Sequence, residues 1–333
     1  MINPWLQFII SAVVIVYAGS KLTKNAAVVA DCIGIGTAWV GALMLPLATS
    51  LPELVTTLRA VTIDTPDLAV GNILGSCLYN LSLLALIDMI EGRGPLTSKV
   101  GKGHIIPASL SVISVCLAAI AMLGITGLKI GWVSFETLLI AGLYFYGSML
   151  LFKYEKKNQP VLTDIEEVPE NNRASGGVAL LNFGIAALFI VVAGVLVTDA
   201  LDLIAVQTGL GHSFVGSLFL AVSTSLPETV TTVSAVRLGY LDMAVANVFG
   251  ANFMNLFIIF IADFVYRNGA LLHAVNETHL FSALLVILIS TVIIFGLTYR
   301  STERKTRVGF DTILALAGYL LVLVVIFRSG GKL

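Results

Sequence analysis

Two segments of the chain carry nearly the same motif, 175 residues apart. The segment LATSLPELVTT begins at Leu47, and AVSTSLPETVTT begins at Ala221. The offset that superposes Glu53 on Glu228 (228 − 53 = 175) continues without a gap through the next thirty or so residues. It also pairs Asp67 with Asp242, Asn72 with Asn247, Gly75 with Gly250, Asn80 with Asn255, and Asp88 with Asp263. Such a match indicates an internal duplication, and a repeat decides the whole architecture of a chain.

Apolar runs of membrane-spanning length recur along the chain, and a helix needs about 20 apolar residues to cross a bilayer. The chain is 57% hydrophobic and 12% charged, whereas a soluble domain carries about 25% charged residues. We place ten spans roughly at 5–20, 28–61, 66–90, 105–124, 131–152, 177–198, 210–236, 241–266, 280–298 and 309–328. The sequence therefore predicts an all-α polytopic membrane protein with ten transmembrane helices.

The duplication divides these ten helices into two units of five. A unit with an odd number of spans returns the chain to the opposite side, so the second copy enters the membrane upside down. Inverted repeats are typical of secondary transporters, whose substrate site lies at the repeat interface near the midplane. We predict a first repeat at 1–152 (duplicated segment about 40–90), a linker at 153–176, and a second repeat at 177–333 (duplicated segment about 215–265).

The placement of Lys and Arg predicts the orientation. Fourteen of the 19 basic residues lie in the loops that follow odd-numbered spans. The side richer in Lys and Arg is cytoplasmic by the positive-inside rule. We expect a multi-pass protein of the plasma membrane, with both termini outside and the polar linker 153–176 in the cytoplasm. The sequence contains no basic patch that would indicate a nucleic-acid partner. The lipid bilayer is the expected surrounding.

Each copy of the motif places a proline and a glutamate inside an apolar helix. Pro52 and Pro227 cannot donate a backbone hydrogen bond, so carbonyls about one turn earlier need another partner. A lone intramembrane Glu can be protonated and bonded to a neighbouring helix, but two in duplicated kinked motifs favour a function. Carboxylates, carbonyls and hydroxyls without Cys or His suit a hard cation, and two charges match one divalent ion. Glu53 and Glu228 are thus the predicted centre of an ion site.

Two further segments, GNILGSCLYN (71–80) and ANVFGANFMN (246–255), follow the glutamates by one span. Ser76 and Asn80 share one helix face, and Asn255 is the counterpart of Asn80. Asn80 and Asn255 are therefore candidate ligands. The remaining Asn residues of the two segments are explained at least as well by packing. The Gly, Pro and polar residues also predict that the second, third, seventh and eighth spans are broken helices.

Other polar residues are expected to have structural roles. Asp67 and Asp242 are expected to precede their helices by a few residues and to cap the N-terminus. Asp88 and Asp263 are expected at the membrane interface, with a part in the ion path as the alternative. The four histidines fall near span ends, where solvated residues are expected: His104, His212, His273 and His279.

The paired TSLPE and GNxxGSxxxN-type segments resemble the α-repeats of the cation/calcium exchanger superfamily, most closely its prokaryotic sodium/calcium exchanger branch. The resemblance covers nearly the whole chain. It implies a ten-helix fold in which two long helices slide against a core of four ion-binding helices. It also implies alternating access, with Ca²⁺ and Na⁺ as the transported ions and no organic cofactor.

The resemblance assigns roles to residues by position. It implies acidic calcium ligands at Glu53 and Glu228, backbone carbonyl ligands at Thr49 and Thr224, sodium-ligating hydroxyls at Ser50, Ser76 and Ser225, and an amide ligand at Asn80. Asn255 stands where some prokaryotic members have Asp, although other sodium/calcium exchangers have Asn there. Ala251 stands where the pattern puts a Ser, which is expected to weaken one sodium position.

The leading hypothesis is a Na⁺/Ca²⁺ antiporter. A H⁺/Ca²⁺ exchanger of the same superfamily is the first alternative, favoured slightly by Ala251 and the Asn partners. A passive cation channel is a second, disfavoured by the symmetric carboxylates and helix breaks. An enzyme is not expected, since no His lies near a mid-membrane Ser, as an intramembrane hydrolase would need. The coupling ion and the oligomeric state stay open at this point.

Overall fold

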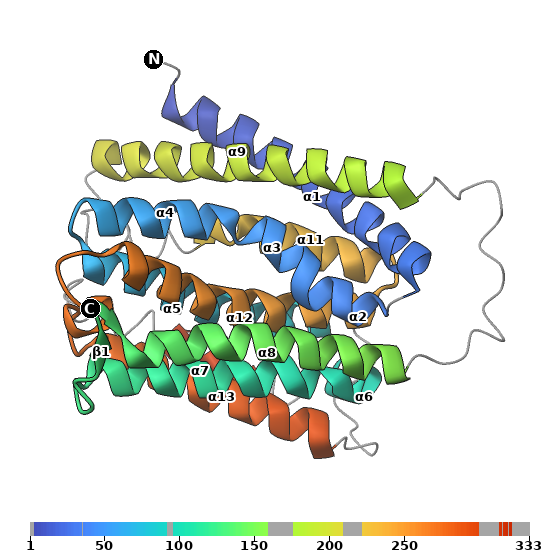
Figure 1. Cartoon of the computed structure of the whole chain (residues 1–333). Coiled ribbons are helices and arrows are strands. Elements are labelled where there is room, and N and C mark those ends of the chain that lie inside the picture. The colour runs from blue at the N-terminus through green and yellow to red at the C-terminus, as the bar shows by residue number, and fades with distance from the viewer. Residues whose placement is uncertain are drawn as a thin grey trace.

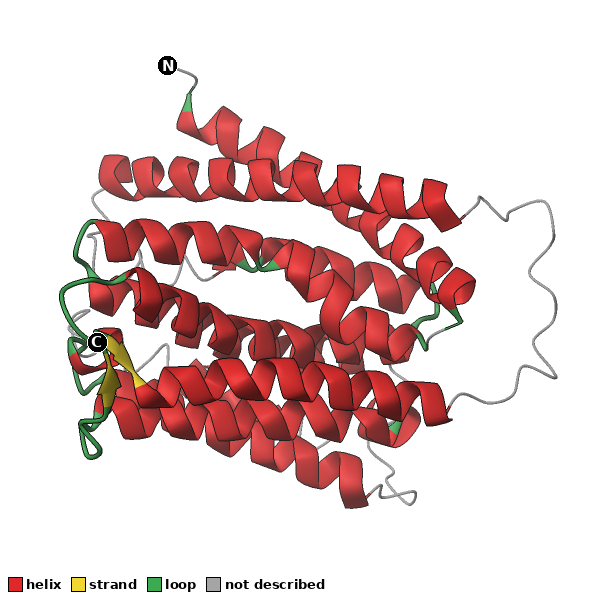
Figure 2. Ribbon diagram, in the orientation of Figure 1, coloured by secondary structure: helices red, strands yellow, loops and turns green. Residues whose placement is uncertain are grey.

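The computed structural model describes residues 3–34, 36–91, 96–158, 176–208 and 222–299, together with seven residues between 313 and 321. Helices make up nearly all of this part of the chain (Figure 2). In the first half they are α1 (Pro4–Ile33), α2 (Thr37–Trp39), η1 (Val40–Met44), α3 (Leu45–Thr49), α4 (Leu51–Thr62), α5 (Pro66–Glu91), α6 (Leu96–Lys99), η2 (Lys102–His104), α7 (Ile105–Met122) and α8 (Phe135–Asn158). A short hairpin, β1 (Lys129–Ile130) with β2 (Val133–Ser134), precedes α8. The second half has α9 (Gly176–Thr208), α11 (Leu226–Arg237), α12 (Leu241–Val265), η4 (Leu271–His273) and α13 (His279–Tyr299).

The structure agrees with a polytopic membrane protein. Within the described residues, seven helices are long and apolar enough to cross a membrane. A helix pair bent by 44°, Thr37–Thr49 with Leu51–Thr62, makes an eighth if it crosses as one span. The seventh predicted span is described only from residue 222, and the tenth lies largely outside the described residues. The predicted linker also lies outside them, from residue 159 to 175.

Several predicted boundaries differ from the structure, among them the end of the sixth span, which continues to Thr208 in α9. The first helix runs on to Ile33, so residues 28–33 do not begin the second span. Gly34 ends this helix in the left-handed conformation (φ 64°), which glycine adopts without steric cost. The fifth span continues to Asn158, so the first residues of the predicted linker are helical. Polar residues at these helix ends extend past the apolar core, and apolar content alone cannot locate such ends.

The prediction that the third and eighth spans are broken is wrong. Helices α5 and α12 are continuous over 26 and 25 residues. Pro66 occupies the first turn of α5, where its missing N–H is not needed. The glycines inside both helices keep their backbone donors, so they lower helix propensity without removing a hydrogen bond.

Helices α5 and α12 form the centre of the bundle (Figure 1). In each of them 72% of the apolar, membrane-spanning stretch is buried, against 33% in α1, α8 and α9. The bent helix α2–α4 and α11 lie along one side of this centre, with α1 and α9 beyond them as the outermost pair. Helices α7, α8 and α13 cover the other side. The central pair is therefore the most enclosed place for polar groups.

Two aspartates near the ends of the central helices, predicted at the membrane interface, are buried within the protein. Asp88 accepts a hydrogen bond from the Leu96 amide (2.8 Å), and Asp263 accepts one from the Leu271 amide (2.7 Å). Each therefore caps the turn that follows its own helix. These contacts are equivalent under the 175-residue offset (96 + 175 = 271).

Two more aspartates join one half of the chain to the other. Asp67 accepts from the His279 ring (3.1 Å) and from the amide of residue 276 (2.7 Å). Asp242 accepts from the His104 ring (2.7 Å) and from the amide of residue 101 (2.7 Å). Each carboxylate lies in the first turn of its helix and binds groups of the opposite half, which the prediction of helix capping did not include. His104 and His279 are buried rather than solvated, and the carboxylates explain why.

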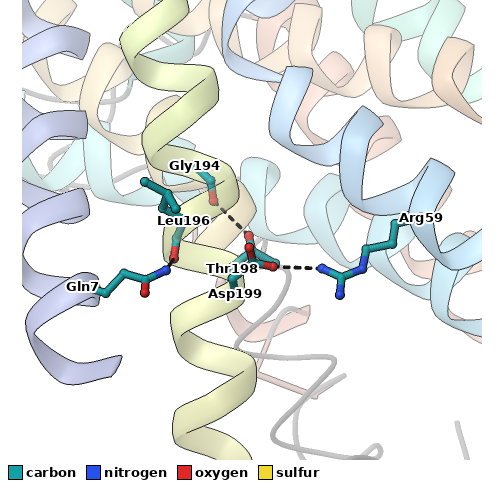
Figure 3. A network of polar contacts seen from close by, with 6 residues as sticks. All are labelled: Gln7, Arg59, Gly194, Leu196, Thr198 and Asp199. Atoms are coloured by element: carbon teal, nitrogen blue, oxygen red, sulfur yellow. Dashed lines mark hydrogen bonds and ion pairs between the residues drawn. The ribbon is translucent and has the colours of Figure 1, made fainter. Parts of the chain in front are cut away.

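An ion pair links the end of the bent helix to α9. Arg59 Nη1 lies 2.9 Å from Asp199 Oδ1, and both side chains are exposed (67% and 40%). Nearby, Thr198 donates to the Gly194 carbonyl, and the Gln7 side chain donates to the Leu196 carbonyl (Figure 3). Exposed pairs of this kind add little to stability.

Replacing Asp263 with Asn is expected to lower the free energy of unfolding by about 2–4 kcal/mol, since a buried acceptor of four hydrogen bonds loses its charge. Asp199→Asn is the matched control and is expected to change it by less than about 1 kcal/mol. Thermal unfolding of both variants in detergent measures the difference. Equal shifts would contradict the assigned role of Asp263.

Candidate functional site

The two TSLPE motifs adopt the same local conformation. Helix α3 ends at Thr49, and Ser50 leaves the helical region (φ −86°, ψ 8°) before α4 begins at Leu51. In the second copy Ser225 has φ −87° and ψ 10° before α11 begins. The break between α3 and α4 interrupts the helical ribbon near the middle of Figure 2. A proline two residues later cannot donate to the preceding turn, which explains a break at this serine in both copies.

The two breaks bring each serine to the opposite glutamate. Ser50 Oγ donates to Glu228 Oε1 (3.0 Å), and Ser225 Oγ donates to Glu53 Oε1 (3.0 Å). Glu53 is 0% exposed and Glu228 is 1% exposed. Both carboxylates therefore lie inside the bundle, joined by crossed hydrogen bonds between the two duplicated motifs.

The two threonines of the motifs also approach these carboxylates crosswise. The Thr224 side chain lies near Glu53, and the Thr49 side chain lies near Glu228. Thr49 Oγ1 also donates to the Leu45 carbonyl (3.1 Å) within its own helix. Six of the predicted site residues thus form one cluster: Glu53, Glu228, Ser50, Ser225, Thr49 and Thr224.

The central helices contribute buried amides. Asn80 Nδ2 donates to Asn252 Oδ1 (3.1 Å), and Asn252 Nδ2 donates to the Cys77 carbonyl (3.2 Å). Asn255 lies against the Cys77 thiol, which in turn is near Glu53. Ser76 and Asn80 are buried and one turn apart on the same helix face. Hydrogen bonds of Asn252 and Asn80 therefore tie α5 to α12 beside the carboxylates.

Several buried oxygens of this region have no hydrogen-bond partner among the described residues. They are Glu53 Oε2, Glu228 Oε2, Ser76 Oγ, Asn80 Oδ1 and Asn255 Oδ1. A buried polar atom without a partner costs about 1–3 kcal/mol, and more when it is charged. Hard cations bind to oxygens of this kind. The described residues hold no cluster of three or more His, Cys, Asp or Glu, so hydroxyl and amide oxygens would have to complete any cation site.

Asn72 and Asn247 support the bent helices. Asn72 Nδ2 donates to Thr57 Oγ1 (3.3 Å), and Asn247 Nδ2 donates to Thr232 Oγ1 (2.9 Å), which is the equivalent pair under the repeat offset. Thr224 Oγ1 also donates to Asn72 Oδ1 (3.4 Å). The amide nitrogens of both residues therefore bind the bent helices, while Asn247 Oδ1 is a further buried oxygen without a partner among the described residues.

The contact between Tyr79 and Thr229 beside the second motif was not predicted. The Tyr79 and Thr229 hydroxyls lie 2.9 Å apart and connect α5 to α11 next to the motif. The repeat offset pairs Tyr79 with Met254 and Thr229 with Leu54, so neither residue has a polar counterpart. A comparison of the two copies therefore could not find them.

The chain is similar to several membrane proteins along three quarters of its length. It is 29% identical over 252 residues to "Inner membrane protein YrbG" of Escherichia coli (strain K12), covering 75% of this chain and 76% of that protein. It is 23% identical over 282 residues to "Sodium/calcium exchanger MaX1" of Methanosarcina acetivorans, covering 77% and 81%.

Solved structures of the sodium-calcium exchanger NCX_Mj share the fold. One, soaked with 10 mM Na⁺, superposes with a TM-score of 0.72 at 20% identity and covers 97% of this chain and 98% of that one. Another, soaked with Na⁺ and Sr²⁺, superposes with a TM-score of 0.73 at 19% identity over the same shares.

The model of the family described as "Sodium/calcium exchanger protein" matches the chain twice, at residues 3–153 and 178–328. The two matches leave out most of the predicted linker and confirm that the chain contains two repeats of one unit. The family is one of exchangers, which are transporters rather than enzymes. The chain therefore belongs to the sodium/calcium exchanger family of membrane proteins.

Proposed function

We propose that this protein is a Na⁺/Ca²⁺ antiporter that binds its ions at Glu53 and Glu228 and exposes them to each side of the membrane in turn. The observation that carries the proposal is the crossed pair of hydrogen bonds between these buried glutamates and the opposite serines. Each carboxylate keeps a second buried oxygen without a partner among the described residues. A cation between the two motifs would satisfy both.

Reciprocal contacts support an inverted-repeat architecture with ten spans. Ser50 contacts Glu228 as Ser225 contacts Glu53, and His104 contacts Asp242 as His279 contacts Asp67. Contacts that exchange in this way are those of two units related by a two-fold axis. With five spans in each unit, that axis lies in the membrane plane, and the site on it lies near the midplane.

Ca²⁺ prefers six to eight oxygen ligands, including carboxylates and carbonyls. We assign the calcium position to the Glu53 and Glu228 carboxylates with backbone carbonyls of Thr49 and Thr224. The assigned sodium ligands are the hydroxyls of Ser50, Ser225 and Ser76, and the amide ligands are Asn80 and Asn255. All nine residues are buried, and none of them brings a soft ligand atom.

Two buried carboxylates also explain why transport would be an exchange. Without cations the pair carries two negative charges, which are costly to move through a low-dielectric region. One Ca²⁺ neutralises them, and so would two or more Na⁺. Only a protein with bound cations can then switch the side of the membrane to which the ion site is open. Each ion that leaves must therefore be replaced by another.

The basic residues support an orientation of the protein in the membrane. The side richer in Lys and Arg faces the cytoplasm, which places the linker there and both termini outside in the plasma membrane.

Uptake of radiolabelled Ca²⁺ into proteoliposomes tests the function. With Na⁺ loaded inside and absent outside, we expect Ca²⁺ uptake that stops when a sodium ionophore removes the gradient. Uptake driven by a pH gradient alone would contradict the sodium assignment. Flux of Ca²⁺ down its own gradient with no counter-ion present would indicate a channel.

A H⁺/Ca²⁺ exchanger is the second candidate, because Ala251 occupies the place of Ser76 in the second copy. Ala251 is fully buried, so this copy lacks one hydroxyl ligand for sodium. If Na⁺ is the coupling ion, Ala251→Ser is expected to lower the Na⁺ concentration for half-maximal exchange by roughly two- to tenfold. This change in affinity corresponds to the free energy of about one hydrogen bond.

The matched control for this variant is Ala244→Ser, which adds a hydroxyl at another fully buried position of α12. We expect no change of Na⁺ dependence in the control. An unchanged dependence in Ala251→Ser, with normal Ca²⁺ transport, would favour protons as the counter-ion.

A further inference from the structure

A cavity of about 930 Å³ lies between α1 and α9, beside the turn that joins α11 to α12. It is on the outermost side of the bundle, where α1 and α9 form the last layer (Figure 1). Its walls include Val13 and Val14 of α1 and Ile185 and Phe189 of α9. We call this cavity the α1–α9 groove. It is separate from the buried glutamate cluster, whose residues do not line it.

The α1–α9 groove changes from apolar to polar along α1. No charged residue precedes Lys21 in the sequence, and the apolar part of α1 before it spans roughly 24 Å. Since the hydrocarbon core of a bilayer is about 30 Å thick, Lys21 marks the level of the lipid headgroups. Beyond it the groove is lined by Lys24 and Asn25, together with Asn182 at the start of α9.

The polar end of the groove is cationic. Neither Lys21 nor Lys24 forms an ion pair with any described residue. The Lys21 ammonium lies 5.7 Å from the centre of the Tyr17 ring, which also lines the groove. Asp31 is the one carboxylate among the described lining residues, and it lies seven positions beyond Lys24, roughly 10 Å further along the helix. The net charge at headgroup level is therefore positive.

We propose that the α1–α9 groove binds an anionic phospholipid of the leaflet that Lys21 faces. The phosphate group would lie between Lys21 and Lys24, and an acyl chain would follow the apolar wall past Val14 and Phe189. The volume is within the range of ligand sites, about 300–1,000 Å³. A free phosphate would use only the polar end and would leave the apolar wall exposed, so a lipid fits both zones. Basic residues next to a membrane helix commonly select anionic lipids.

Native mass spectrometry of the purified full-length protein in detergent tests the proposal. The probes are phosphatidylglycerol and phosphatidylcholine with identical acyl chains. We expect one phosphatidylglycerol to bind in preference to phosphatidylcholine. The double variant Lys21→Gln, Lys24→Gln is expected to lose roughly 10- to 30-fold in affinity for phosphatidylglycerol. Lys102→Gln is the matched control, because Lys102 is exposed and outside the groove.

A second pair of variants tests the apolar wall. Val13→Trp places a large ring in the groove and is expected to weaken phosphatidylglycerol binding, whereas Ile10→Trp, one turn earlier on an exposed part of α1, is not. Equal affinity for the two lipids would overturn the proposal, since ordinary surrounding lipid would then explain the groove. Displacement of the lipid by soluble glycerol phosphate would also overturn it, in favour of a free-anion site. Because binding is measured without ion gradients, this result does not depend on the antiport assignment.

Discussion

Glu53→Gln is expected to abolish Ca²⁺ uptake into proteoliposomes, with a loss of at least about 100-fold in apparent Ca²⁺ affinity, because calcium sites are tuned by the number of ligand charges. The same result is expected for Glu228→Gln. Gln keeps the volume of the side chain and an oxygen that can accept the hydrogen bond from Ser225 or Ser50. The variants therefore remove one charge with little change of packing.

Folding and binding are separable in this experiment. Removing a charge from the buried cluster is expected to leave thermal stability unchanged or to raise it, since burying a carboxylate is costly. Ca²⁺ should raise the unfolding temperature of the natural protein, because a ligand that binds only the folded state stabilises it. We expect this Ca²⁺-dependent shift to disappear in both variants.

Glu136→Gln provides the control. Glu136 is also a buried glutamate, but it lies on α8 and accepts a hydrogen bond from Thr126, away from the two motifs. It is expected to keep both transport and the Ca²⁺-dependent shift. Normal transport by Glu53→Gln or Glu228→Gln would remove that residue from the ion site.

The repeat in the sequence predicted much of the glutamate cluster. A shared offset identified Glu53, Ser50 and their counterparts as equivalent residues, and the proline after each serine predicted the helix break that the structure shows. The sequence could not show that the hydrogen bonds cross between copies. Equivalent positions in the two repeats indicate that two residues have similar surroundings. They do not indicate whether each residue contacts its own repeat or the other repeat.

The aspartates show the same limit. A carboxylate in the first turn of a helix predicts capping of that helix, which is the local solution. Asp67 and Asp242 instead bond a histidine and an amide of the opposite half. The contact of Asn252 with Cys77 was the hardest to predict. The offset pairs these two positions with each other (77 + 175 = 252), but their residue types differ, so the repeat gave no matching polar pair. Their contact depends on the packing of α5 against α12, which local sequence patterns do not determine.

Gly250→Ala is expected to lower the free energy of unfolding by about 3 kcal/mol, at the upper end for overpacking. Gly250 of α12 lies against η1, the part of the bent helix between α2 and α3, which leads to Glu53. A methyl group there would overlap the Ala42 carbonyl oxygen and lie 2.6 Å from the Ala42 Cα. The obstacle is backbone, which cannot rotate away as a side chain could, so the two helices would have to separate. Thermal unfolding in detergent measures the loss.

Two other glycines and a second variant make this prediction specific. Gly142 and Gly184 also lie inside helices, but a methyl group at either would meet nothing within 4 Å. Replacing either with Ala is expected to stabilise the protein by about 0.5–1 kcal/mol, since Ala favours the helix. Adding Ala42→Gly to Gly250→Ala is not expected to restore stability, because the overlap is with the backbone of residue 42 and not with its side chain. Recovery of stability in that double variant would show that side chains hold the two helices apart. The close approach of the two backbones would then not determine the position of the helix that carries Glu53.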